Sequence, residues 1–334
     1  MKKTITCLAA LAVLCCLSVP AKAGGVTLSY SNFFPPTHIQ SKLAEAWCAE
    51  VEKRTNGAVK VDYYPGGTLT KAPAAYDGVV EGLSDVGMSA LAYSRGRFPV
   101  MAAVDLPMGY TSGVQATGVA NGVYAKFHPA ELSDTKVMYF HAHGPGLLHT
   151  KGVEVRKLED MQGLKLRATG NSAKVVKALG GTPVAQSMPD AYQAIQKGVV
   201  QGGMYPLETN EGWKMAEVVD HCTETFSVAY TTTFFVVMNK AKWESLPAEA
   251  KAAIESINAE WGAKHGQAWD DSDVSGKAFL KAKGGDFIAL SDEEAARWKA
   301  AAAPIIDDYV ADSEGKGLPG KAVVDYIRAS LNAN

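Results

Sequence analysis

The chain has few of the features that mark enzymes, nucleic-acid-binding proteins or membrane proteins. Its 33 lysines and arginines nearly balance its 35 aspartates and glutamates, so no basic patch is expected for a nucleic acid or an anionic membrane. No Gly-x-Ser-x-Gly sequence is present, and the Gly-Gly pairs are isolated instead of forming a loop that could cradle phosphates. We therefore expect no nucleic-acid partner, no cofactor and no catalytic activity.

Cysteine is also scarce, with five residues in the chain, of which three lie among the first sixteen. Cys48 and Cys222 are the two that remain beyond this segment. If the protein is exported to a compartment that permits disulfides, this even number of cysteines allows a Cys48–Cys222 bridge. Because the bridge would close a long loop, it would add roughly 4–5 kcal/mol to the free energy of unfolding. Two separately buried thiols are an equal alternative, because the sequence does not place the two Cα atoms.

The one long apolar run lies at the N-terminus. Two lysines open it, an apolar stretch follows over Thr4–Val19, and Ala21-Lys-Ala23 provides the small residues of a cleavage site. This pattern predicts an export signal over residues 1–23 and a mature protein in the periplasm. The segment carries three lysines and no acidic residue, so its removal takes the formal net charge from −2 to −5.

Helical and strand patterns alternate through the rest of the chain, which predicts an α/β fold. The mature chain is long enough for two hydrophobic cores. Gly144-Pro-Gly146 and the β-branched, aromatic run Tyr230–Asn239 are the expected crossings between them. These crossings predict a first lobe of residues 24–144 and 230–269, and a second of residues 145–229 and 270–334 that includes the C-terminal helices.

A helical pattern from Pro247 to Phe279 is longer than one lobe needs. Ile254, Ile257 and Trp261 recur at helical spacing within it, and a helix of this length spans roughly 50 Å at 1.5 Å per residue. The alternative is a pair of helices broken near one of its glycines, Gly262 or Gly266.

The most informative segment is Leu158-Glu-Asp-Met-Gln-Gly-Leu-Lys-Leu-Arg167. It reads as a short strand that ends on a lone arginine, just before Ala168-Thr-Gly170. A guanidinium at the edge of a sheet offers a planar fork of donors that matches a carboxylate and stays charged at any working pH. An arginine held in an ordinary ion pair is the alternative interpretation.

This segment is similar to a signature of the extracytoplasmic solute-binding receptors of TRAP transporters, the DctP-type family. Further stretches resemble that family in order and approximate spacing: Tyr76–Gly87, Asp105–Pro107, Ala194–Gly202 and Phe235–Asn239. The resemblance covers nearly the whole mature chain. It implies a two-lobed periplasmic-binding-protein fold with a long helix spanning both lobes, a small-molecule carboxylate bound by Arg167, and delivery to TRAP transporter membrane subunits.

The expected lining of the binding site is rich in apolar side chains. Where the sialic-acid branch of the family has polar groups or Phe, this chain has Leu147, Tyr205 and Met188, and further candidates are Phe33, Phe34, Met88, Tyr93 and Trp213. Such a pocket leaves the hydroxyls of a sugar acid unpaired and favours a monocarboxylate with an aromatic or hydrophobic body, such as an aryl-acetate or aromatic 2-oxo acid. Asn32 and Tyr205 could orient the ligand, and His149 could donate to its carboxylate. Each of these side chains could instead belong to a hydrophobic core.

Two rival functions fit part of the sequence. His141-Ala-His143 places two imidazoles on one face of a strand near His149, so the three could bind zinc, although no His-Glu-x-x-His arrangement supplies a general base. A binding protein of another uptake system, such as an ABC-type receptor, would share the two-lobed architecture. The Leu158–Arg167 segment and the long helix favour the TRAP receptor over both.

Overall fold

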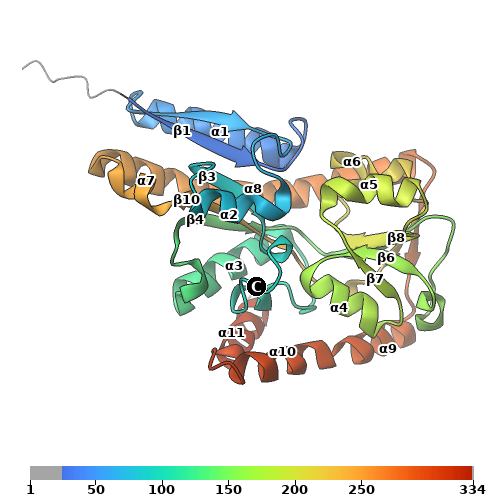
Figure 1. Cartoon of the computed structure of the whole chain (residues 1–334). Coiled ribbons are helices and arrows are strands. Elements are labelled where there is room, and N and C mark those ends of the chain that lie inside the picture. The colour runs from blue at the N-terminus through green and yellow to red at the C-terminus, as the bar shows by residue number, and fades with distance from the viewer. Residues whose placement is uncertain (1–24, 333–334) are drawn as a thin grey trace, which may run out of the picture.

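The computed structural model describes residues 25–332, which form two α/β lobes side by side (Figure 1). The export signal predicted over residues 1–23 lies outside the described residues. The α/β, two-lobed prediction is confirmed. No helix within residues 25–332 is both long enough and apolar enough to cross a membrane.

The first lobe is built on a five-stranded sheet in the order β2-β1-β3-β10-β4. The strands β1, β2 and β3 run parallel, whereas β10 runs antiparallel to its neighbours β3 and β4. The elements of this lobe are β1 (Val26–Asn32), α1 (Ile39–Arg54), β2 (Val59–Tyr64), α2 (Ala75–Val80), β3 (Val86–Ala90), α3 (Gly113–Phe127), β4 (Thr135–Ala142) and β10 (Thr233–Asn239).

The second lobe is built on a six-stranded sheet in the order β11-β9-β5-β8-β6-β7. Its strands β6, β7 and β8 are parallel, and β5 is antiparallel to β8 and β9. The elements of this lobe are β5 (Leu147–Thr150), β6 (Lys165–Ala168), α4 (Gly170–Ala178), β7 (Thr182–Ala185), α5 (Met188–Gln196), β8 (Gly202–Tyr205), α6 (Thr209–Gly212), β9 (His221–Glu224), β11 (Asp286–Ala289) and α9 (Asp292–Ala302).

The two crossings predicted from the sequence lie next to each other between the lobes. Gly146, which follows β4, donates its backbone N–H to the carbonyl of Tyr230, which precedes β10, at 2.8 Å. A Cβ at Gly146 would lie only 2.2 Å from the Tyr230 ring, so the missing side chain is what lets the two segments touch. The chain thus passes between the lobes through a narrow, paired connection.

One unbroken helix, α8 (Ala248–Ala282), joins the lobes after the short helix α7 (Lys240–Ser245). The prediction of a long helix is confirmed, and the alternative of a break near Gly262 or Gly266 is wrong. Its N-terminal part packs against α1, α3 and β4 of the first lobe, and its C-terminal part contacts α6 of the second. Ile254 and Trp261 are accordingly buried in a core of the first lobe, and Leu280 is buried in a core of the second lobe.

The boundaries predicted from the sequence place the C-terminal helices in the second lobe, but the last two helices also contact the first lobe. The helix α10 (Pro304–Glu314) contacts α4 of the second lobe, yet its Tyr309 hydroxyl donates to the carbonyl of Pro99 in the first. The last helix, α11 (Gly320–Asn332), packs on α3 of the first lobe (Figure 1). Apolar periodicity shows that a helix has a buried face, but not which lobe buries it.

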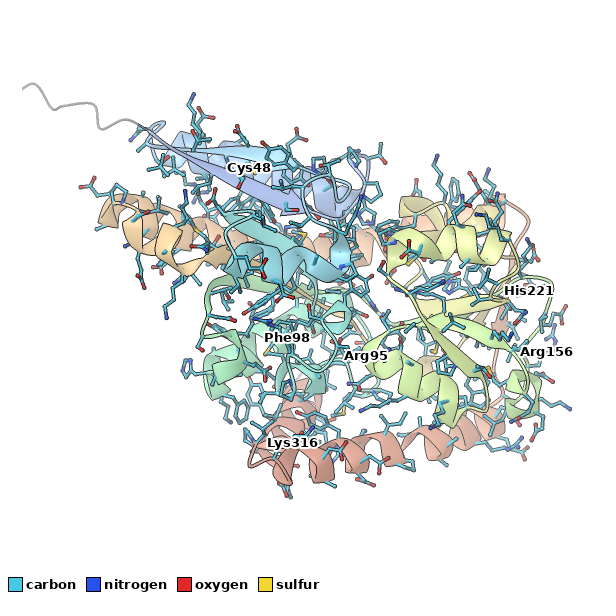
Figure 2. All side chains as sticks on the ribbon, in the orientation of Figure 1. Cys48, Arg95, Phe98, Arg156, His221 and Lys316 are labelled. Atoms are coloured by element: carbon cyan, nitrogen blue, oxygen red, sulfur yellow. The ribbon has the colours of Figure 1, made fainter. Side chains whose placement is uncertain are left out.

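Of the two alternatives for the cysteines, the Cys48–Cys222 bridge is wrong, because both cysteines are free and buried. Cys48 lies on α1 in the core of the first lobe, and Cys222 lies on β9 in a core of the second. Figure 2 shows how far apart these places are, with Cys48 in the first lobe and His221, the neighbour of Cys222, toward the far side of the second. The alternative of two separate buried thiols is the correct one.

Candidate ligand-binding site

The ends of strands from both lobes meet where the lobes face each other. Because β6, β7 and β8 are parallel, their carboxyl ends share one edge, and Arg167 and Tyr205 lie at that edge. In the first lobe, Phe33 and Phe34 follow directly after β1, and Tyr93 follows soon after β3. Open α/β sheets bind ligands at such edges, so both lobes present their natural binding edge to the same space.

A cavity lies between these edges. It is small, with a volume of about 30 Å³. The residues around it are Phe33, Phe34, Tyr93, His143, Arg167, Thr169, Met188, Tyr205, Pro206, Glu208, Thr209, Trp213, Tyr230, Thr232, Phe234 and Trp269. The lobes are therefore closed on each other, with both contributing to one small, mostly aromatic enclosure.

Arg167 lies in this cavity without a counter-ion. Its side chain is only 4% exposed, and it donates from Nε to the carbonyl of Gln186 at 3.0 Å and from Nη1 to that of Met204 at 3.3 Å. A longer contact of 3.5 Å joins Nη2 to the hydroxyl of Tyr93. Within residues 25–332 no acidic side chain pairs with Arg167, so the alternative of an ordinary ion pair is wrong. A buried charge that lacks a partner costs several kcal/mol, which a bound anion would recover.

Gly203 makes the space that Arg167 and Tyr205 share. Gly203 lies opposite Arg167 in the sheet, two residues before Tyr205. A Cβ there would lie 2.9 Å from the Arg167 carbonyl oxygen and 3.0 Å from the Tyr205 ring. The glycine therefore allows a guanidinium and a phenol to stand side by side on the same face of the sheet.

The hydroxyl of Tyr205 is an unused donor in the cavity. It is buried and has no hydrogen-bond partner in the described part of the chain. Burial raises the pKa of Tyr205 well above its usual value, so the proton is retained. Its ring stacks on the imidazole of His149, with centroids 4.3 Å apart, which fixes the direction of the hydroxyl. An anion held by Arg167 could accept from this hydroxyl as well.

Aromatic rings from four parts of the chain form the walls. Phe33 stacks on Trp213 with centroids 6.0 Å apart, and Phe234 stacks on Trp269 at 5.2 Å. Phe34 lies between these pairs, 5.9 Å from Trp213 and 5.4 Å from Phe234. The rings offer flat apolar surface to a flat apolar ligand.

The structure brings most of the candidate site residues together. Arg167, Tyr205, Met188, Phe33, Phe34, Tyr93 and Trp213 all line the cavity. Four other candidates do not: Leu147, His149, Asn32 and Met88.

These four side chains have structural surroundings instead. Leu147 and His149 lie beneath the Tyr205 side of the second sheet, where the larger Tyr205 ring covers His149. Asn32 donates to the Tyr63 hydroxyl and accepts from the N–H of Phe34, so it shapes the loop that carries the two phenylalanines. Met88 is buried in the first-lobe core. The alternation of side chains along a strand predicts which face of the sheet each side chain lies on, but not whether that side chain reaches the cavity.

The proposed zinc ligands His141, His143 and His149 do not gather in one place. Nδ1 of His141 accepts from the Trp269 indole at 3.0 Å, whereas Nδ1 of His143 lies 2.6 Å from the Gly144 carbonyl. Burial lowers the pKa of His143 to about 4 and that of His149 to about 3, so both are neutral. The metal-enzyme alternative therefore has no support in its geometry, and His149 carries no charge that could attract a carboxylate.

Several cavity residues were missed from the sequence: His143, Thr169, Pro206, Glu208, Thr209, Tyr230, Thr232, Phe234 and Trp269. Those between Tyr230 and Phe234 belong to the run that was predicted to cross between lobes, and a crossing between two facing edges necessarily borders the space between them. Trp269 lies on α8, within the long helical pattern, where helical spacing alone does not distinguish a core residue from one that faces a cavity. Glu208 had no signal, because a single acidic residue in a loop is normally exposed.

Buried carboxylates near the site predict how stability depends on pH. Burial and the charges of nearby Glu208 and Asp270 raise the pKa of Asp273 on α8 to about 8, and burial raises that of Asp105 to about 7. The folded protein keeps these protons where the unfolded chain releases them, so its free energy of unfolding falls as the pH rises toward 8. Burial lowers the pKa of His141, His143, His149 and His265, which therefore act in the opposite direction, but only below pH ~6.5, where unfolded histidine gains a proton.

We therefore expect the free energy of unfolding to fall by about 1–3 kcal/mol between pH 6.5 and pH 8. Urea unfolding at the two pH values measures this change. The variant Asp273→Asn should lose more than half of it, because the amide has no proton to release in this range. A wild-type stability that is constant or rises over this interval would contradict the assignment.

Two lobes closed over a buried, unpaired cation define the chain as a solute-binding protein. The family model described as "Bacterial extracellular solute-binding protein, family 7" (DctP) matches residues 30–313. The chain belongs to this family, which confirms the resemblance to TRAP receptors and sets aside the ABC-type alternative. The family consists of solute-binding receptors.

Three known proteins show the range of relatives. The C4-dicarboxylate-binding periplasmic protein DctP of Rhodobacter capsulatus is 29% identical over 304 residues, 87% of this chain and 89% of that protein. A marine metagenome TRAP solute-binding protein specific for aromatic acid ligands, solved with metahydroxyphenylacetate, is 30% identical, with a TM-score of 0.87 and coverage of 92% and 99% of the two chains. A TRAP solute-binding protein from Rhodoferax ferrireducens T118, solved with copurified benzoate, is 27% identical, with a TM-score of 0.87 and coverage of 92% and 98%.

Proposed function

We propose that this chain is a periplasmic receptor that binds a monocarboxylate with an aromatic or hydrophobic body and delivers it to TRAP membrane subunits, without catalysing a reaction. The observation that carries this proposal is the buried guanidinium of Arg167, which has no acidic partner in the described chain and faces an aromatic enclosure. A carboxylate would complete its hydrogen bonds, and Tyr205 would supply a further donor.

The charges around the cavity favour one carboxylate over two. Arg167 is the one arginine among the lining residues, no lysine is among them, and His143 is neutral at pH 7. A second carboxylate would find no cation there and would meet the acidic side chain of Glu208. A C4-dicarboxylate, which names the Rhodobacter relative, therefore fits this cavity poorly.

The walls favour a flat apolar body. Polar side chains other than Arg167, Tyr205 and Glu208 also line the cavity, but several of them already have partners. The hydroxyl of Thr209 donates to the carbonyl of Pro206 at 2.8 Å, and the indole N–H of Trp269 donates to His141 at 3.0 Å. A sugar acid would leave several hydroxyls unpaired, whereas an aromatic ring gains stacking and burial against Phe33, Trp213 and Phe234. The two solved relatives with aromatic acids support the same class.

Closure of the lobes would couple binding to delivery. Tyr93 of the first lobe accepts from the N–H of Met188 at 3.0 Å and contacts Arg167, so both contacts exist only while the lobes are together. Because the space between the closed lobes is small, an aromatic acid needs some opening of the lobes to enter. We propose that the lobes open about the paired connection at Gly146 and Tyr230, and that the acid then stabilises the closed form.

A thermal-shift panel tests the proposal. Phenylacetate, mandelate, benzoate and phenylpyruvate form one group, succinate and malate a second, and glucuronate a third. At least one aromatic acid at 100 times its Kd should stabilise the mature protein by about 2.7 kcal/mol, while the other groups leave the melting midpoint unchanged. Stabilisation only by dicarboxylates or sugar acids would contradict the proposed ligand class.

A further inference from the structure

A second polar group lies in the cavity wall, formed by one residue from each lobe. Nε2 of His38, the residue before α1, lies 2.9 Å from Oε2 of Glu208, which follows β8. Both side chains are almost completely buried, with His38 1% and Glu208 2% exposed. The pair is too enclosed to be a surface ion pair, and Glu208 itself lines the cavity.

The hydrogen bonds around His38 assign the direction of this contact. Nδ1 of His38 accepts from the backbone N–H of Gln40 at 3.2 Å, so the proton of a neutral imidazole lies on Nε2 and is donated to Glu208. Oε2 of Glu208 is thereby satisfied. Its second oxygen, Oε1, accepts no hydrogen bond from any residue in the range 25–332, which leaves it as an acceptor available to the cavity.

The backbone holds Glu208 firmly in this place. Its N–H donates to Oδ1 of Asp273 on α8 at 2.8 Å. Gly212 packs against both members of the pair, and a Cβ there would lie 2.6 Å from Oε2 of Glu208 and 2.9 Å from the His38 ring. The free oxygen is therefore a fixed feature of the wall and not one conformer of a mobile side chain.

A row of rings separates Glu208 from Arg167. Tyr93 contacts Arg167, Phe33 lies 5.7 Å from Tyr93, and Phe34 lies 4.2 Å from Phe33. The His38 ring follows, with its centroid 4.5 Å from that of Phe34. The wall therefore runs from a cation, along three aromatic rings, to an acceptor.

We infer that the ligand carries a hydrogen-bond donor, a hydroxyl or amino group, on the part of its body remote from the carboxylate, and that Oε1 of Glu208 accepts from this donor. The inference rests on the proposed function and narrows its ligand class to hydroxy- or amino-substituted aromatic acids. An unsubstituted ring leaves a buried carboxylate oxygen without a partner, which is the situation in which binding sites discriminate most strongly. Because His38 and Glu208 belong to different lobes, the ligand's donor can contact this pair only when the lobes are closed.

The test compares phenylacetate with its 3-hydroxy, 4-hydroxy and 3-methoxy derivatives by isothermal titration calorimetry. The wild-type protein should bind one hydroxyphenylacetate at least tenfold more tightly than phenylacetate, and the methoxy compound, which has no donor, more weakly than the hydroxy compound. In Glu208→Gln the amide oxygen still accepts from His38 while a donor replaces Oε1. The preference for the hydroxyl should therefore fall to less than about threefold.

The matched control is Glu211→Gln, which removes the same charge from an exposed residue of the adjacent helix α6 and should keep the preference. Equal wild-type affinities for phenylacetate and both hydroxyphenylacetates would overturn the inference, and so would a Glu208→Gln variant that weakens all of these acids by the same factor. If none of the aromatic acids bound the wild-type protein, the proposed function itself would fail. The wild-type comparison decides the matter even where the variant does not fold.

Discussion

Replacing Arg167 by methionine is expected to weaken the binding of an aromatic acid by about 150- to 4,000-fold. The methionine keeps the length of the side chain but removes the charge, so the carboxylate would be buried without a partner, at a cost of roughly 3–5 kcal/mol. The stability of the ligand-free protein should change much less. The loss of two hydrogen bonds to carbonyls is offset by the removal of a buried charge that has no counter-ion. Calorimetric titration with phenylacetate and urea unfolding measure the two quantities separately.

Arg95→Met is the matched control for this experiment. Arg95, labelled in Figure 2, is an exposed residue whose loss changes the net charge by the same amount. Its affinity for phenylacetate should stay within about threefold of the wild-type value. An Arg167→Met protein that binds as tightly as the wild type would show that the guanidinium has only a structural role.

Replacing Gly276 by alanine is expected to damage both stability and binding, although the residue lies on α8 outside the cavity. A Cβ at this position would lie 2.1 Å from the carbonyl oxygen of Leu207 and 2.8 Å from the Cα of Glu208, so backbone must move. The loop that moves carries Glu208 and Pro206 at the cavity wall. We expect a loss of about 1–3 kcal/mol in the free energy of unfolding and at least a tenfold loss of affinity for phenylacetate.

Gly262→Ala on the same helix provides the comparison. The nearest atom to a Cβ at Gly262 lies 3.7 Å away, an ordinary contact, so the higher helix propensity of alanine should leave stability unchanged or raise it by about 0.5–1 kcal/mol. Its affinity should equal that of the wild type. Equal behaviour of the two alanine variants in urea unfolding and titration would show that α8 does not position the Pro206–Glu208 loop.

Features that depend on local patterns could be predicted from the sequence. The helical periodicity of α8 persists over many turns, so the length of the helix could be predicted from the sequence. Its continuity could not, because a break near Gly262 or Gly266 stays open until the packing around these glycines is known. Gly266, for example, faces Thr117, where a Cβ would lie 3.1 Å from the hydroxyl oxygen. Arg167 at the end of a short strand was visible for a similar reason, since strand ends that precede a helix form the binding edge of an α/β sheet.

Features that depend on how distant segments meet could not be predicted. Glu208 is buried because His38, 170 residues earlier in the chain, donates to it across the lobes. Leu147 and His149 lie on the expected face of their strand, but the Tyr205 ring from the neighbouring strand reaches further into the cavity. The sequence allows a bridge between the two cysteines, but in the fold they lie in the separate cores of the two lobes. A sequence pattern shows which face of a helix or strand a side chain lies on. How deeply that side chain is buried, and which residues it contacts, depends on tertiary packing.

The central claim is that Arg167 serves as the counter-ion of the ligand in an otherwise aromatic cavity. Calorimetric titration of the wild-type protein with phenylacetate and with phenylacetamide tests it most directly, because the two molecules have nearly the same shape and differ in charge. We predict that the acid binds at least 100-fold more tightly than the amide, and that Arg167→Met removes most of this difference. Equal binding of the acid and the amide by the wild-type protein would contradict the account.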